Sequence, residues 1–142
     1  MEVTFRQFLD TYLEAWRSSS LTDLKEMISP DYQAREITGG EIDDFGYKES
    51  INGWEQGFQF VKESNAKWIV DEISIIPLRA DESMVILSAT MMINENKLET
   101  ANLLFQTFKR NSQDEWKLVR SHIEAGIPNS QLDRIQFKSF VE

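Results

Sequence analysis

The sequence has no cysteine, one histidine and three prolines among its 142 residues. The lack of cysteine excludes disulfides, thiolate metal sites and cysteine nucleophiles. No apolar run approaches the roughly 20 residues that span a bilayer. The N-terminus has neither the basic start nor the hydrophobic stretch of a signal peptide. We therefore expect a cytoplasmic protein with no membrane partner.

Positive charge is also scarce, with 15 lysines and arginines against 24 aspartates and glutamates and a net charge of −9. A chain without a basic stripe is a poor partner for nucleic acid, and we expect none. The acidic residues Glu41, Asp43 and Asp44 lack the Asp-x-Asp-x-Asp-Gly spacing of a calcium loop, so no metal site is expected. The hydrophobic content of 41% is sufficient for the core of one domain.

The first half of the chain has helical periodicity. Apolar residues recur on one face over residues 5–16, and Thr4 with Gln7 forms a capping-box pattern. A second helix is expected from Ser20 to Ile28, because Pro30 must end it. A short strand over 32–38, an acidic loop over 41–46 and a third helix over 47–64 follow. Within that helix the glycines at 53 and 57 each cost about 1 kcal/mol relative to alanine, which indicates a close strand or a ligand beside them.

The second half has strand-like patterning. Runs at 68–78, 82–94, 97–109 and 116–124 are separated by short polar breaks, which predict an antiparallel meander. The result is an α+β domain over residues 1–127 with helices on one face of the sheet. Apolar residues on both faces predict a homodimer through the outer sheet face, where we place Gln106. Residues 128–142 form a C-terminal tail, which we expect to dock on the domain or on the dimer partner. The prediction rests on its apolar side chains, Leu132, Ile135, Phe137 and Phe140.

This order of elements resembles the NTF2-like superfamily, which includes SnoaL-like polyketide cyclases, ketosteroid isomerase and scytalone dehydratase. The similarity is carried by FLDTYLEAWRSSSLTDLKEMISPDY at 8–32 and by EWKLVRSHIEAG at 115–126. It implies a cone in which three N-terminal helices pack on a curved, mostly antiparallel sheet around a cavity. It implies little about function, because that superfamily contains enzymes, binding modules and assembly domains.

The last strand carries the candidate catalytic residues. Period-2 alternation places Arg120, His122 and Glu124 on the same face as Trp116 and Leu118. If that face lines the cavity, His122 is the candidate base, Glu124 orients it, and Arg120 holds a carboxylate or an oxyanion. The alternative is a structural ion pair at the end of the sheet, or a dimer contact.

Aromatic side chains are the candidate ligand-binding residues, with core packing as the alternative role. They are Trp16, Tyr32, Tyr47, Trp54 and Phe58. Glu36 shares a strand face with Tyr32 and is either an acid or base in the cavity or half of a surface ion pair.

Ligand binding is the function that these residues favour, with a small, largely apolar molecule in the cavity. One alternative is a SnoaL-like or ketosteroid-isomerase-like enzyme that transfers a proton alpha to a carbonyl. The other is a non-catalytic homodimerisation domain. No cofactor is required, and a flavin stacked on the cavity aromatics remains an open alternative.

Overall fold

The computed structural model describes residues 3–135. The elements are, in chain order, α1 (Phe5–Arg17), α2 (Leu21–Glu26), β1 (Ile28–Thr38), β2 (Glu41–Gly46), α3 (Tyr47–Glu63), β3 (Ala66–Arg79), β4 (Glu82–Ile93), β5 (Asn96–Lys97), β6 (Thr100–Arg110), β7 (Trp116–Pro128) and α4 (Asn129–Leu132).

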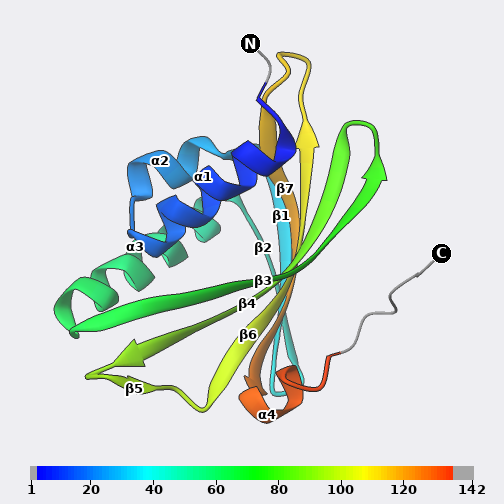
Figure 1. Cartoon of the computed structure of the whole chain (residues 1–142). Helices are drawn as coiled ribbons and strands as arrows, with labels where there is room; N and C mark the ends of the chain where they lie inside the picture. Colours follow the sequence, from blue (N-terminus) through cyan, green and yellow to red (C-terminus); the bar gives the residue numbers. More distant parts are fainter. Residues whose placement is uncertain (1–2, 136–142) are drawn as a thin grey trace.

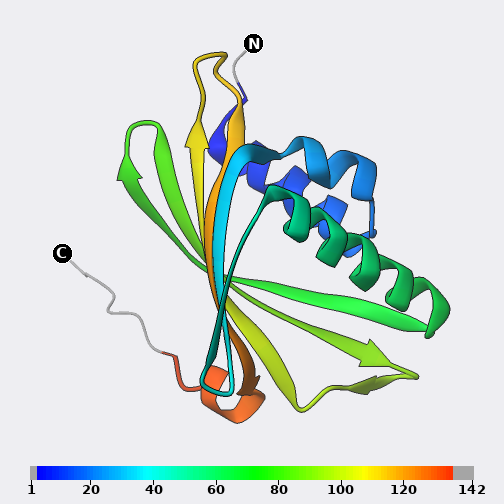
Figure 2. The ribbon, with the colours of Figure 1, turned by 180° about the vertical axis from the view of Figure 1, so that it is seen from behind.

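The strands form one strongly curved sheet in the order β2-β1-β7-β6-β4-β3, with β5 paired to β4. All neighbouring strands are antiparallel except β1 and β7, which are parallel. Helices α1, α2 and α3 lie together on the concave side of the sheet (Figures 1 and 2). The predicted α+β class and the mostly antiparallel meander are confirmed.

Helix α1 anchors the core against the sheet. Both hydrogen bonds of the capping box between Thr4 and Gln7 are present at its start. Its inner face buries Leu9, Tyr12, Leu13, Ala15 and Trp16, and Tyr12 is fully buried there. The ring of Tyr12 lies 5.1 Å from that of Phe108 on β6, so the aromatic face predicted for this helix meets the sheet.

The region between the helices differs from the prediction. The second helix ends at Glu26, and Ile28 already begins β1, because the Leu118 amide of β7 donates to the Met27 carbonyl and the chain turns extended there. The predicted acidic loop is strand β2, which pairs with β1 through a turn at Gly39 and Gly40. Both glycines have positive φ, at 56° and 93°, so the turn needs them.

The chain after β7 continues into α4, which contacts β6 and β7. Asn129 fixes its start, because its amide donates to the Glu99 carbonyl and its side chain donates to the Leu98 carbonyl. Phe137 and Phe140 of the predicted tail lie outside the described residues. No helix within residues 3–135 is long and apolar enough to cross a membrane.

Candidate functional site

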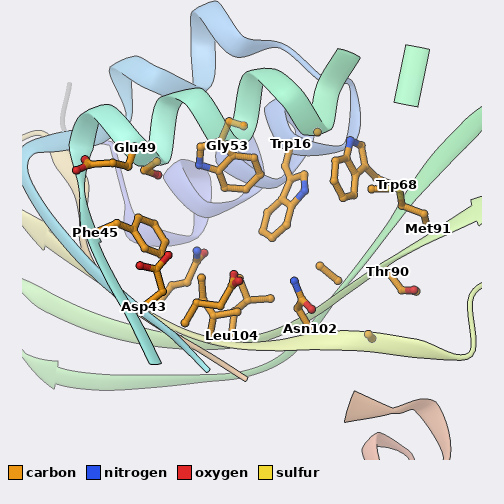
Figure 3. A pocket seen from close by; sticks show the side chains of 18 of the residues that line it. Trp16, Asp43, Phe45, Glu49, Gly53, Trp68, Thr90, Met91, Asn102 and Leu104 are labelled. Atoms are coloured by element: carbon orange, nitrogen blue, oxygen red, sulfur yellow. The ribbon is translucent and has the colours of Figure 1, made fainter. Parts of the chain in front are cut away.

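A cavity of about 640 Å³ lies between the helices and the concave face of the sheet (Figure 3). Its volume is within the range of sites for small organic ligands. Side chains from both layers line it, among them Trp16, Tyr32, Glu36, Asp43, Phe45, Glu49, Ser50, Trp54, Trp68, Met91, Asn102, Leu104, Gln106 and Ile123.

Three indoles form one end of the cavity. The ring of Trp16 on α1 meets that of Trp54 on α3 edge to face, with centroids 4.7 Å apart, and that of Trp68 on β3 at 6.1 Å. Trp68 is held by a hydrogen bond from its Nε1 to Ser19 Oγ. A Cβ added at Gly57 would lie 3.6 Å from the Trp68 ring, so the missing side chain lets α3 approach this strand closely.

Gly53 has a different reason to be small. It lines the cavity, and a Cβ added there would meet no atom of residues 3–135 within 4 Å. The two glycines therefore have separate roles, since Gly57 gives room to a strand and Gly53 faces open space.

Carboxylates lie at the opposite end, beside Phe45. Glu36 on β1 and Asp43 on β2 are direct partners across the antiparallel pair, and both line the cavity. Glu49 approaches from the first turn of α3, where the helix dipole favours a negative charge. Figure 3 shows Asp43, Phe45 and Glu49 together at this end, with Trp68 and Met91 at the other.

A buried polar network supports the wall of the cavity. The Tyr12 hydroxyl donates to Gln106 Oε1 at 2.9 Å, and Gln106 Nε2 donates to Ser121 Oγ at 3.2 Å. Burial raises the pKa of Tyr32 to about 12, although hydrogen bonds with Ser121 and Ser50 oppose this effect. Tyr32 therefore remains a neutral hydroxyl at physiological pH and can exchange hydrogen bonds with a ligand.

The predicted shared face of the last strand is wrong, because β7 carries a bulge. Thr107 and Phe108 are adjacent on β6, but their partners Arg120 and Leu118 are two residues apart on β7. The extra residue, Val119, reverses the alternation. Leu118 before the bulge is in the core, and after it Ile123 points inward.

Arg120, His122 and Glu124 therefore lie on the outer face, away from the helix-covered cavity. His122 Nε2 is 2.7 Å from Glu124 Oε2. Arg120 donates at 2.7 Å to the nearly buried carboxylate of Glu82. That hydrogen bond, together with one from Arg79, holds the pKa of Glu82 below its usual range. A catalytic role for the three residues stays a prediction, but not one attached to this cavity.

The other predicted site residues divide between cavity, core and outer surface. Trp16, Tyr32 and Trp54 line the cavity. Phe58 is 3% exposed and packs in the core below the indoles. The Tyr47 hydroxyl donates to the Lys25 carbonyl outside the cavity lining.

Gln106 also differs from its prediction, because it is 1% exposed and faces the helices. Sequence reasoning missed Asp43 and Phe45 as well, since their segment was interpreted as a loop. If the segment had been interpreted as a strand, its period of two would have placed Asp43 and Phe45 on one face.

Within residues 3–135 no group of three or more histidine, aspartate or glutamate side chains is arranged to hold a metal ion. The carboxylates at the acidic end are thus too dispersed for a metal centre. The arrangement instead provides an apolar chamber with hydroxyl and amide groups on its wall and negative charge at one end.

Comparison with solved structures identifies the fold. A proposed calcium/calmodulin-dependent protein kinase type II association domain from Thiobacillus denitrificans is similar over 88% of this chain and 97% of that one, with a TM-score of 0.66 and 18% identity. An NTF-2 like protein of unknown function from Shewanella oneidensis is similar over 84% and 94%, with a TM-score of 0.63 and 18% identity.

The chain has the NTF2-like fold. A ketosteroid isomerase-like protein from Erwinia carotovora atroseptica shares it over 82% of this chain and 89% of that one, with a TM-score of 0.59 and 13% identity. No protein-family model and no curated protein matches the sequence. The NTF2-like fold is therefore established here, whereas the activity has to be argued from the cavity.

Proposed function

We propose that this NTF2-like protein binds a small, largely apolar organic molecule in the cavity between its helices and its sheet. The observation that carries the proposal is the chamber of about 640 Å³, whose lining combines three tryptophans and the apolar side chains of Phe45, Met91, Leu98, Leu104 and Ile123 with acidic and other polar side chains. Burial of a ligand's apolar surface against such a wall contributes roughly 25 cal/mol per Å² before the cost of immobilising the ligand is subtracted.

Gly53 offers a direct test, because a side chain added there would enter open space at the cavity. The Gly53→Phe variant should fill part of the chamber, whereas Gly53→Ala changes the helix backbone in the same way and leaves the chamber open. The probe is N-phenyl-1-naphthylamine, an uncharged dye that brightens in apolar surroundings. Wild type and Gly53→Ala should bind it saturably, and Gly53→Phe should bind it about tenfold more weakly, which corresponds to roughly 1.4 kcal/mol. Equal binding by all three proteins would contradict the proposal.

Self-association is a second candidate function, supported by the outer sheet face. Phe105 on β6 lies there beside His122, with ring centroids 6.1 Å apart, and its cross-strand partner on β4 is Ile86. Met84 and Leu103 extend this apolar patch; Phe105, Met84 and Leu103 are half-buried, Ile86 is 7% exposed, and no helix within the described residues covers them. The similarity to a protein described as an association domain adds support.

We propose that two copies pair through this face. Sedimentation velocity should then show a dimer for the wild type and a monomer for Phe105→Glu, because a carboxylate cannot be buried unpaired in an apolar interface. The matched control is Phe60→Glu, which changes a phenylalanine on α3 that is already 45% exposed. A wild-type monomer, or a dimer that survives Phe105→Glu, would exclude this interface.

The enzymatic alternative, proton transfer alpha to a carbonyl, is less well supported. Its proposed base His122 and proposed electrophilic partner Arg120 face away from this cavity. They line a separate open hollow on the outer face of the sheet, and Arg120 is bound to Glu82. Binding is therefore the function favoured for the chamber.

A further inference from the structure

We propose that the outer face of the sheet carries a second binding site, which takes a small organic carboxylate. Arg120 and Thr107 hold the carboxylate group, and Phe105 and Met84 contact the apolar body of the molecule. The site lies in the open hollow of about 940 Å³ on that face. The hollow and the chamber share lining residues on β1, β2 and α3, but these four side chains line the outer hollow alone, so the site does not depend on the chamber.

The four residues are neighbours on the sheet. Arg120 on β7 and Thr107 on β6 are direct partners, and Met84 on β4 is the partner of Thr107 on its other side. Phe105 precedes Thr107 by two positions on β6, so their side chains point to the same face. Directly opposed side chains on a sheet are about 5 Å apart at Cβ. One small molecule can therefore contact the guanidinium, the hydroxyl and the apolar pair together.

Glu82 holds the guanidinium of Arg120 in place. Its carboxylate, 8% exposed, accepts from Arg120 Nη2 at 2.7 Å and from Arg79 Nη1 at 2.9 Å. Because β6 lies between β4 and β7, the Arg120 side chain crosses β6 to reach Glu82. A guanidinium has five N–H donors, and this is the one side-chain hydrogen bond of Arg120 within residues 3–135. The side chain is 56% exposed, so its other donors can bond a ligand carboxylate.

This end of the outer face is positively charged, although the whole chain has a net charge of −9. Glu82 is the register partner of Arg79 on β3 and of Lys109 on β6. Lys109 is in turn the partner of Lys117 on β7. With Arg120, this row across the sheet has four positive side chains and one carboxylate. An anion that binds at Arg120 therefore enters a positive local field.

The carboxylates that line the hollow lie on the other side of Arg120. Asp44 on β2 is paired with Arg35 at 2.7 Å, and Asp31 and Glu49 belong to β1 and α3. In the sheet order β2-β1-β7-β6-β4, β1 and β2 are separated from β6 by β7. We therefore expect the ligand carboxylate on the β6 side of Arg120.

The hydroxyl of Thr107 is a second observation that points to a ligand. Thr107 is 6% exposed and lines the hollow, yet no hydrogen bond within residues 3–135 uses its hydroxyl. Buried hydroxyl groups usually have a partner, and a carboxylate beside Arg120 supplies an acceptor. Phe105 and Met84 are half-buried next to it, and they favour an organic acid over an inorganic anion because they provide apolar contact area.

Methionine methyl NMR separates the two sites, because Met84 lines the outer hollow and Met91 lines the chamber. The probes are 4-phenylbutyrate, an anion, and 4-phenylbutanol, which is neutral and of nearly the same shape. The protein is labelled with carbon-13 at its methionine methyl groups and diluted until it sediments as a monomer, because a second copy on this face would compete with the probe. Phenylbutyrate should shift the Met84 signal saturably, with an affinity about tenfold higher than that of phenylbutanol.

Two variants test the contacts to the carboxylate. Arg120→Gln should weaken the binding of phenylbutyrate about tenfold, and Thr107→Val, which keeps the shape of the side chain, about threefold. The matched control is Arg79→Gln, which removes the same charge and the same kind of bond to Glu82 but lies outside the lining of the hollow. It should change the affinity less than twofold.

Equal losses in Arg120→Gln and Arg79→Gln would overturn the proposal, since the charge would then act at a distance and not by contact. Equal affinity of the anion and the alcohol at Met84 would overturn it as well, as would an unchanged Met84 signal at tens of millimolar phenylbutyrate. A shift of Met91 alone would place the probe in the chamber, which would refute the outer site and leave the ligand binding proposed for the chamber standing.

Discussion

The hydrogen bond between Tyr12 and Gln106 offers a sharp test of how the cavity wall is held. The Tyr12 hydroxyl is fully buried and donates at 2.9 Å to Gln106, which is itself 1% exposed and donates onward to Ser121. Gln106→Met keeps an unbranched side chain of similar size but removes both hydrogen bonds. It leaves the Tyr12 hydroxyl without a partner, and a buried unsatisfied group costs about 1–3 kcal/mol. With the lost bond to Ser121 we expect a total destabilisation of about 2–4 kcal/mol.

Tyr12→Phe should cost less, about 1–2 kcal/mol, because only the Gln106 acceptor is then left without its donor. In the double variant both the Tyr12 hydroxyl and the Gln106 amide are removed, so neither leaves the other as a buried group without a partner. The destabilisations of the two single variants should therefore not add. We expect a coupling free energy of about 1–2 kcal/mol, well above the additivity error for independent sites.

The assay is equilibrium unfolding in urea, followed by tryptophan fluorescence, for the wild type, both single variants and the double variant. With a urea slope of about 2 kcal/mol per M, a 2 kcal/mol loss lowers the midpoint by about 1 M. Tyr47→Phe is the control, because its hydroxyl makes only a long, exposed hydrogen bond of 3.4 Å, and its effect should stay within about 0.5 kcal/mol. Costs that add within about 0.5 kcal/mol in the double variant would refute the network.

Two further predictions concern stability. Gly53→Ala should raise the free energy of unfolding by about 0.5–1 kcal/mol, because the new methyl group enters open space and alanine is the better helix former; a loss in urea unfolding would show that α3 needs the glycine. Glu82 has a pKa depressed below its usual 4.5 by Arg120 and Arg79, so the stability it contributes is complete above about pH 4.5 and disappears as the pH falls through its folded value. Thermal melts of Glu82→Gln between pH 6 and pH 3 should therefore show a shallower acid decline than those of the wild type, and parallel declines would contradict the assigned ion pairs.

Much of the architecture follows from local patterns along the chain. The apolar stripe of α1 and the Thr4–Gln7 capping box are short-range features, because side chains three and four residues apart share a helix face. The third helix was predicted over 47–64 and spans Tyr47–Glu63. The antiparallel meander of the second half could also be predicted from the sequence, since the breaks between its strands are too short for crossover helices.

The elements that were predicted wrongly depend on pairing between segments that are distant in the sequence. Residues 41–46 are mostly polar, and their sequence predicts a loop. They form strand β2 instead, because their backbone pairs with the edge of β1. In the same way, Ile28 was predicted in the second helix but lies in β1, because the Leu118 amide of β7 donates to the Met27 carbonyl just before it. Backbone hydrogen bonds with a remote strand outweigh a local propensity that differs by only a few tenths of a kcal/mol per residue.

The candidate site shows the same division. The sequence by itself determined that Trp16 and Trp54 would lie on the inward-facing stripes of their helices, because periodicity fixes which side chains share a face. Only the tertiary structure decided where Arg120, His122 and Glu124 point, because a single bulge at Val119 reverses the alternation after it. It also decided that Glu36 and Asp43 oppose each other across β1 and β2, since register is a property of two strands and not of either sequence alone.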